Sequence, residues 1–333
     1  MQEHELGDLG IFRIPVPIPF HNAGGPVNAY IVEEEDGFLL FDPGLGTAQS
    51  QAALAAGVAR TGHRFDQVSR IVLSHGHIDH FGAAAWVQEQ AGRTIPISIH
   101  NADAGKVLDS RTDWPALLRS NGEYFSKLGV PPRVLDEMVA DIGTDAAMGK
   151  RLAEVKPPLQ GDRFHCSHVT LEVHHMPGHT PGVCCLYERN HRLLFSADHI
   201  LEHVSPNPLI ELELNGEPSS FKPLVSYFES LDRVRTLDVD LVLPGHGAPF
   251  SGYLQVIESL CAFYERRHAK LLQALKRSPL TVYEATAKLF SLTSTFELFL
   301  MISEALGNLE LLEHKGTVQR ETCGGLVRFR LES

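Results

Sequence analysis

Four side chains of types that bind metal ions lie within six positions of one another, directly after the apolar run at residues 71–73. They are His75, His77, Asp79 and His80. On extended backbone the i, i+2 spacing points the first two imidazoles to the same side, while the aspartate and the last histidine lie on the turn into a helix and can face back toward them. One metal ion cannot easily use all four ligands, so the segment indicates more than one ion.

Three further candidates follow later in the chain, each at a strand-to-loop junction with small or turn-forming neighbours. They are His179 in PGHTPG, Asp198 in FSADH and His246 in PGHG. Together the seven nitrogen and oxygen ligands fit two cations, and neighbouring metal ions that share a carboxylate recur in hydrolytic enzymes. The chemistry indicated is therefore metal-assisted hydrolysis.

Two divalent ions in such a site would lower the pKa of a bridging water toward neutrality, supply hydroxide as the nucleophile and polarise a carbonyl or phosphoryl oxygen. No protein nucleophile is needed for this reaction. Asp79 is the candidate for orienting the hydroxide and for handling its proton after attack, because it would lie next to both ions.

The elements that must position these residues alternate between strand and helix. Residues 25–44 have the pattern of a hairpin with a polar turn at 33–37, and a helix is expected over 47–59. A short buried strand then leads into the histidine segment, and the following helix could be capped by Asp79. The strand TIPISIH completes a β-α-β order.

Residues 101–158 turn helical, with proline pairs as punctuation. Strands resume with HVTLEVHHMPGH, with a hairpin in VCCLYERNHRLLFSAD and with VDLVLPGHG. After residue 250 the pattern is three helices and then two short strands around Lys315-Gly316 and Gly324-Gly325.

Composition limits the class of protein. The chain has 333 residues, 43% of them hydrophobic, which suits a globular protein with one large domain or with one large and one small domain. No basic leader and no long apolar run precede or interrupt it, so we expect a cytoplasmic protein that does not enter a membrane. The net charge of −12 argues against a general nucleic-acid surface. The odd number of cysteines, five, predicts reduced and buried thiols.

The histidine segment resembles the signature H-x-H-x-D-H of the metallo-β-lactamase superfamily, which residues 75–80 meet in full. The resemblance implies an α/β (α+β) fold, the αβ/βα sandwich of two mixed sheets flanked by helices, with two divalent metal ions at one edge. The implied metal is zinc, with iron or manganese as alternatives. It also implies that Asp42 in the DPG turn supports the site from behind. The implied ligands are His75, His77 and His179 for one ion, Asp79, His80 and His246 for the other, and Asp198 as the bridge.

The last part of the chain resembles a small winged-helix domain that is appended to one branch of this superfamily. We therefore expect a catalytic domain over 1–250, with a helical insert at about 101–158, and a winged-helix-like domain over 251–333. That branch contains thioester or ester hydrolases and also ribonucleases. Because the charge of the appended domain is nearly balanced, a packing or homodimerisation role is favoured over nucleic-acid binding.

The leading functional hypothesis is a dinuclear metal-dependent hydrolase of a small thioester, ester or lactone, similar to hydroxyacylglutathione hydrolase and the glyoxalase II-like branch. The alternative is a metal-dependent endoribonuclease or phosphodiesterase that binds RNA through the winged helix; nucleic acid is disfavoured, because no basic groove is evident. The insert residues Trp114, Tyr124 and Phe125 either contact substrate or form the insert's own core. His199 either touches substrate or packs beside Asp198.

Overall fold

The computed structural model describes residues 3–19, 24–108, 114–141, 148–156, 161–212, 219–291 and 297–332. The chain forms two units, and each is built from three separate stretches of sequence. The first unit contains Met1–Arg111, Asp145–Pro206 and Leu231–Val256, and the second contains Thr112–Thr144, Asn207–Ser230 and Ile257–Ser333. The expected boundary at residue 250 lies near the last step between units, but the second unit also takes two stretches from the middle of the chain.

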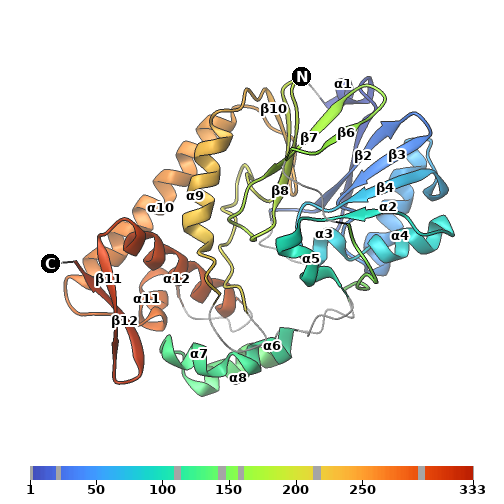
Figure 1. The fold of residues 1–333 in the computed structure, drawn as a ribbon. Helices are drawn as coiled ribbons and strands as arrows, with labels where there is room; N and C mark the ends of the chain where they lie inside the picture. The colour runs from blue at the N-terminus through green and yellow to red at the C-terminus, as the bar shows by residue number, and fades with distance from the viewer. Residues whose placement is uncertain are drawn as a thin grey trace. The chain divides into compact units, whose positions relative to one another are not determined.

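The first sheet of the first unit contains five strands in sequence order (Figure 1). They are β1 (Ile11–Val16), β2 (Val27–Glu34), β3 (Gly37–Phe41), β4 (Val68–Val72) and β5 (Ile97–Ser98). The first three strands are antiparallel, and β3, β4 and β5 are parallel. The hairpin expected over 25–44 is therefore present as β2 and β3. Strand β1 was not among the expected strands.

The second sheet also mixes parallel and antiparallel pairs. Its strands, in spatial order, are β10 (Leu241–Pro244), β9 (Leu193–Ala197), β8 (Cys184–Glu188), β7 (Thr170–His175) and β6 (Arg163–His165). Strand β10 runs parallel to β9, and the other neighbours are antiparallel. The expected architecture of two mixed sheets is confirmed.

A hydrophobic core joins the two sheets. Tyr30 and Phe41 of the first sheet each meet Phe195 of the second in an edge-to-face contact, with ring centroids 5.2 and 6.0 Å apart. Every residue of β8 and β9 is buried, which explains why these strands are continuous apolar runs without alternation.

Helices cover the other face of the first sheet with a second apolar cluster. They are α2 (Ala48–Arg60), α3 (Ile78–Phe81), α4 (Ala84–Ala91) and α5 (Asn101–Val107). The hydroxyl of Thr47 caps α2 by accepting a hydrogen bond from the backbone N–H of Ser50. The expectation that Asp79 caps the next helix is wrong: α3 begins after His77, and Asp79 lies inside its first turn. The carboxylate is thereby left to face the histidines.

The second unit has a core of its own, which the insert shares with the C-terminal segment. Its helices and strands are α6 (Trp114–Ser120), α7 (Gly122–Lys127), α8 (Pro132–Asp141), α11 (Val282–Leu289), α12 (Leu298–His314), β11 (Val318–Cys323) and β12 (Leu326–Leu331). Helices α9 (Pro223–Val234) and α10 (Tyr253–Leu275) contribute residues to both units. The expected order of three helices and a hairpin after residue 250 is present, and its winged-helix character stays a prediction.

Among the described helices, none is both long and apolar enough to cross a membrane. All five cysteines are free thiols. Cys184 and Cys185 are buried, as expected, but Cys323 is exposed at the tip of the C-terminal hairpin.

Candidate metal centre

The predicted ligands all follow the carboxyl ends of strands. The segment from His75 to His80 follows β4, and His179 follows β7. Asp198 directly follows β9, and His246 comes two residues after β10. Because β7, β9 and β10 run in the same direction, their carboxyl ends lie at one edge of the second sheet. The fold thus brings together side chains that are up to about half the chain apart.

Three histidines form the first group. The Nδ1 atom of His77 lies 3.0 Å from Nε2 of His75 and 2.9 Å from Nε2 of His179. These ligand atoms all lie within 4.8 Å of one another, so they could hold one metal ion. A tetrahedral zinc ion with bonds of about 2.0–2.1 Å would place its nitrogen ligands about 3.3 Å apart, close to the observed spacing.

The second group combines histidine and carboxylate. His246 Nε2 lies 3.4 Å from Asp79 Oδ2, and His80 Nε2 lies 3.4 Å from Asp198 Oδ1. The other oxygen of Asp198 lies 3.5 Å from both His246 Nε2 and His179 Nε2. One carboxylate therefore faces both groups, which is the position that a bridging ligand requires.

The second ring nitrogen of several histidines has its own partner. His75 Nδ1 lies 2.8 Å from Ser74 Oγ, and His246 Nδ1 lies 3.2 Å from the carbonyl oxygen of Gly25. Metal-binding histidines show this arrangement, because the outer hydrogen bond fixes the ring and leaves the other nitrogen for the ion.

Two buried atoms inside the cluster have no hydrogen-bond partner among the described residues. They are Nε2 of His80 and Oδ1 of Asp198, which face each other at a distance too long for a good hydrogen bond. Buried polar atoms are rarely left unpaired, because their desolvation is costly. A divalent cation between these atoms would satisfy both, so the residues present fit a metal site.

Opposite charges within the cluster govern its pKa values. Burial, helped by neighbouring imidazoles, lowers the pKa of His75 and His77 well below the usual value. Burial would also lower the pKa of His80, but the carboxylate of Asp198 outweighs it and raises that pKa. Against burial, the same carboxylate raises the pKa of His246 to about 10. Without an ion these two imidazoles hold protons, which a metal ion must displace.

Asp42 lies behind the histidine segment, where the resemblance implied it. Its carboxylate accepts hydrogen bonds from the backbone N–H and the hydroxyl of Ser74, at 2.7 and 2.6 Å, and from Nδ1 of His80 at 2.9 Å. Asp42 and Ala197 both adopt left-handed backbone, with φ of 52° and 46°. For residues other than glycine this conformation costs energy and persists only where surrounding contacts impose it.

Sequence reasoning did not identify Asn28 as part of the site. Its side-chain NH₂ donates to the carbonyl oxygens of Pro244 and Gly247 at 2.9 and 2.8 Å. The hydroxyl of Tyr30 also donates to Pro244, at 2.8 Å. These bonds tie strand β2 to the loop that carries His246. The sequence did offer one indication of this role, because Asn28 is a polar residue among the apolar residues at the start of β2.

A second overlooked residue, Asp103, lies on α5 and contacts both loops of the three-histidine group. No local signal in the sequence distinguishes it, because an aspartate in the first turn of a helix is common.

The remaining predicted residues are His199 and three aromatic residues of the second unit. His199 is completely buried, which favours the packed alternative over contact with substrate. Phe125 is completely buried in the core of the second unit, with its ring 6.3 Å from that of Phe299, so it is a core residue there. The side chain of Trp114 lies outside the described residues.

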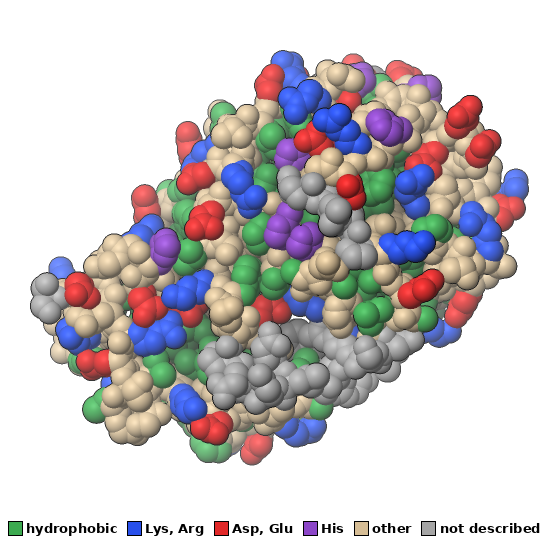
Figure 2. All heavy atoms as spheres, viewed as in Figure 1, with side chains coloured by type: hydrophobic (Ala, Val, Ile, Leu, Met, Phe, Trp, Pro, Cys, Tyr) green, Lys and Arg blue, Asp and Glu red, His purple; other side chains and the backbone are tan. Residues whose placement is uncertain are grey.

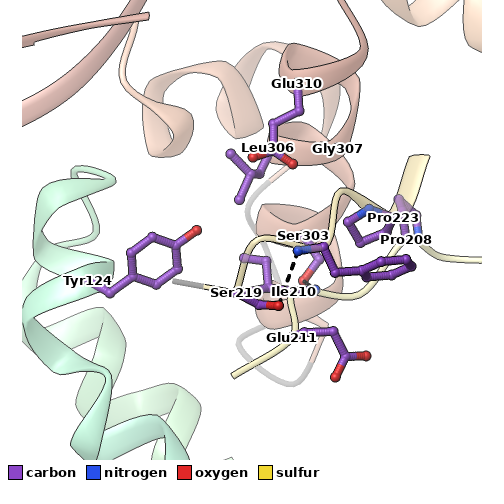
Figure 3. Close-up of a pocket in the computed structure, with 11 residues that line it drawn as sticks. Tyr124, Pro208, Ile210, Glu211, Ser219, Pro223, Ser303, Leu306, Gly307 and Glu310 are labelled. Atoms are coloured by element: carbon purple, nitrogen blue, oxygen red, sulfur yellow. Dashed lines mark hydrogen bonds between the residues drawn. The ribbon is translucent and has the colours of Figure 1, made fainter. Parts of the chain in front are cut away.

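Tyr124 lines a pocket whose lining residues all belong to the second unit (Figure 3). Its hydroxyl points into the pocket, toward the helix that carries Ser303 and Glu310. Burial, followed by the nearby Glu310 carboxylate, raises the pKa of Tyr124.

Figure 2 shows a group of histidine side chains near the middle of the visible face, beside hydrophobic atoms, and further histidines scattered over the same face.

Comparisons with known proteins agree with this geometry. The chain is 27% identical to a probable metallo-hydrolase, YqjP, of Bacillus subtilis (strain 168), over 96% of this chain and 97% of the relative. It is 27% identical to the acyl-coenzyme A thioesterase MBLAC2 of Gallus gallus, over 73% of this chain and 79% of that protein. The crystal structure of the metallo-β-lactamase family protein TTHA1429 from Thermus thermophilus covers 97% of this chain and 98% of its own, with a TM-score of 0.76 and 25% identity.

The model of the metallo-β-lactamase superfamily matches residues 22–246, which include every predicted ligand. This stretch is about two thirds of the chain, and it begins before β2 and ends at the last histidine of the cluster. The chain belongs to the metallo-β-lactamase superfamily.

Proposed function

We propose that this protein hydrolyses a small thioester, ester or lactone. Membership of the superfamily and the cluster of histidine and aspartate ligands make it a metal-dependent hydrolase. The observation that carries the proposal is the arrangement of the ring nitrogens: one nitrogen of each histidine faces the cluster, while outer partners hold His75, His80 and His246 by the other.

The proposed ligands are those that the resemblance implies, with His75, His77 and His179 around one ion. Asp79, His80 and His246 would hold a second ion, and Asp198 would bridge the two. Zinc fits these nitrogen and oxygen ligands, as do iron and manganese. Such ions supply Lewis acidity and an activated water at neutral pH.

Asp79 is the proposed residue for orienting the attacking water and receiving its proton. Its carboxylate points from the first turn of α3 toward His246 and is only partly exposed. Because no backbone N–H or hydroxyl group among the described residues donates to it, the carboxylate remains available to a water in the cluster.

The preference for a carbonyl substrate has two supports. The MBLAC2 relative is named an acyl-coenzyme A thioesterase and aligns with most of this chain. In addition, the arginines of the C-terminal hairpin are paired with carboxylates: Arg320 with Glu310 and Glu313, and Arg328 with Glu284. A hairpin that inserts into RNA would need such cations for phosphates.

The test combines metal content with a substrate panel. Purified protein is measured by mass spectrometry for metal ions per chain and assayed with an acyl-coenzyme A, S-lactoylglutathione, an acyl lactone, a simple ester, bis-p-nitrophenyl phosphate and single-stranded RNA. Two ions per chain with turnover of the carbonyl compounds alone is the expected result. Cleavage restricted to the phosphodiester or RNA would favour the nuclease alternative instead.

Asp79→Asn tests the role of the aspartate. We expect the variant to lose at least 100-fold in kcat, because proton transfer contributes about 10²–10⁴-fold. His191→Ala is the matched control, since His191 lies in the turn between β8 and β9, bonded to Glu188 and away from Asp198 at the other end of β9. An Asp79→Asn protein that keeps both ions and full turnover would refute the role.

A further inference from the structure

Asp103 is a buried carboxylate outside the predicted ligands. It lies on α5, is completely inaccessible to solvent and has every oxygen bonded. Its Oδ2 accepts hydrogen bonds from the backbone N–H of Gly76 at 3.0 Å and from the hydroxyl of Thr180 at 2.6 Å. Its Oδ1 accepts from the N–H of Gly182 at 3.2 Å and pairs with Lys106 Nζ at 3.0 Å.

The loop partners of Asp103 belong to the two segments that carry the three-histidine group. Gly76 lies between His75 and His77, and Thr180 directly follows His179. The two loops are about 100 residues apart in the chain and extend from different sheets. A single carboxylate therefore holds the backbone on both sides of the three-histidine group.

Helix α5 packs tightly against the two loops around this carboxylate. A Cβ atom on Gly182 would lie 2.8 Å from the Cβ and Cγ atoms of Asp103, and one on Gly76 would lie 2.7 Å from Cβ of Lys106. Both loops therefore need glycine where they contact α5, because the helix lies directly against their backbone. The carboxylate can reach both N–H groups for the same reason.

We infer that Asp103 is a positioning residue for the three-histidine metal site, holding the loops of His77 and His179 at the separation that one ion requires. This inference rests on the metal site of the proposed function. It differs from the role of Asp42, which bonds a ligand ring directly. Asp103 touches no ligand ring in the hydrogen bonds described and acts through backbone and a hydroxyl group.

The expected consequence concerns the affinity of one ion. Without Asp103 the separation of the two loops would depend more on the ion itself, so metal binding would have to order them. Removal of residues that orient metal ligands lowers metal affinity by about 10–100-fold. The ligands Asp79, His80 and His246 form no described hydrogen bond with Asp103 and should keep their ion.

The test uses Asp103→Asn, which preserves size but replaces one acceptor by an NH₂ group facing a donor. The zinc-loaded, full-length protein is titrated with a chromogenic chelator, and the retained zinc is counted by mass spectrometry. We expect the variant to release one of its two ions at a chelator concentration about 10–100-fold lower than the wild type. Thr180→Val, which removes one bond to Asp103 and is nearly isosteric, should shift the same ion in the same direction by a smaller factor.

Glu188→Gln is the matched control. Glu188 is also a buried carboxylate that accepts backbone N–H groups, from Asn190 at 3.2 Å and His191 at 2.6 Å, but it lies at the opposite end of β9 from Asp198. It should lower the melting temperature of the metal-free protein without changing the chelator titration.

Two outcomes would overturn the inference. One is a chelator titration of Asp103→Asn and Thr180→Val that matches the wild type; the other is an equal shift in Glu188→Gln, which would show a general loss of stability. If Asp103→Asn fails to fold, the Thr180→Val titration decides alone. A wild-type protein that binds no zinc would instead refute the proposed metal site itself.

Discussion

The carboxylate of Asp42 and the imidazole of His80 form a completely buried pair, with Oδ2 and Nδ1 2.9 Å apart. A carboxylate can only accept, so Nδ1 of His80 keeps a proton, and Nε2 is the nitrogen that faces the cluster. Asp42 thus selects Nε2 as the nitrogen that loses its proton when an ion binds.

Replacement of Asp42 by alanine should weaken both stability and metal binding. The N–H and hydroxyl groups of Ser74 and the N–H of His80 would be left buried without acceptors, at a cost of about 1–3 kcal/mol for an unsatisfied group. Urea unfolding of the metal-free protein should show the loss of stability, and mass spectrometry should show zinc below two per chain. Normal zinc content in a destabilised protein would contradict the orienting role.

Asn28→Asp should be more harmful than Asn28→Ala. The aspartate would place a carboxylate oxygen against the carbonyl oxygens of Pro244 and Gly247, where the NH₂ group now donates. Arg13 Nη1 now donates to Asn28 Oδ1 at 3.2 Å, so Arg13 can offset the new negative charge only at that oxygen. We expect the alanine variant to lose about 1–3 kcal/mol and the aspartate variant more, measured by urea unfolding at neutral pH. An equal loss of stability in the two variants would mean that the NH₂ group of Asn28 does not hold the His246 loop.

Gly245→Ala should disrupt the cluster through sterics alone. A Cβ atom at this position would lie 2.2 Å from Oδ1 of Asp198 and 2.9 Å from the backbone of Ala197, so the carboxylate would have to move. We expect loss of bound zinc without a change in any ligand residue. Gly105→Ala is the control, because a Cβ atom there meets nothing within 4 Å. Retention of both ions by Gly245→Ala would show that the loop can shift freely.

His268, in α10, should make stability depend on pH. Burial, followed by Lys315, lowers its pKa to about 4, and its buried Nε2 has no hydrogen-bond partner in the part of the chain that the structure describes. In the unfolded chain this imidazole is protonated below a pH of about 6.5, its ordinary pKa. The contribution of His268 to the free energy of unfolding is therefore fully retained above that pH and decreases as the pH falls from about 6.5 toward 4. His268→Leu should reduce the loss between pH 7 and pH 5 by about 1–2 kcal/mol in urea unfolding. An unchanged pH profile would mean that folding does not change the pKa of this imidazole.

The positions of the seven expected ligands could be predicted because each has a local signal. His75, His77 and His80 follow a buried strand within a few residues, and Gly-flanked His246 marks the end of another. Asp42 was also predictable, because the turn at residues 42–44 resembles a turn of the superfamily. The assignment of these residues as ligands stays a prediction, while the fold that brings them together was predicted correctly in its two mixed sheets.

Other features could not be predicted, because they depend on pairs distant in sequence. Asp103 bonds groups 27 and 77 residues away, and nothing near it indicates this. The same is true of Phe125, whose core partner Phe299 belongs to a helix near the end of the chain. Periodicity identified the insert as helical but could not show which apolar surface it packs against.

The interleaved arrangement of the two units has a consequence for the order of folding. The three stretches of the first unit have all been synthesised by residue 256, whereas the core of the second unit needs α11, α12 and the final hairpin. During synthesis the apolar faces of helices α6–α8 therefore have no packing partner until more than 100 further residues have been added. Contacts between such distant segments form slowly, and exposed apolar helices are prone to aggregate in the interval. Chaperones should therefore bind mainly nascent chains that stall after residue 256 and before α11, α12 and the final hairpin are synthesised.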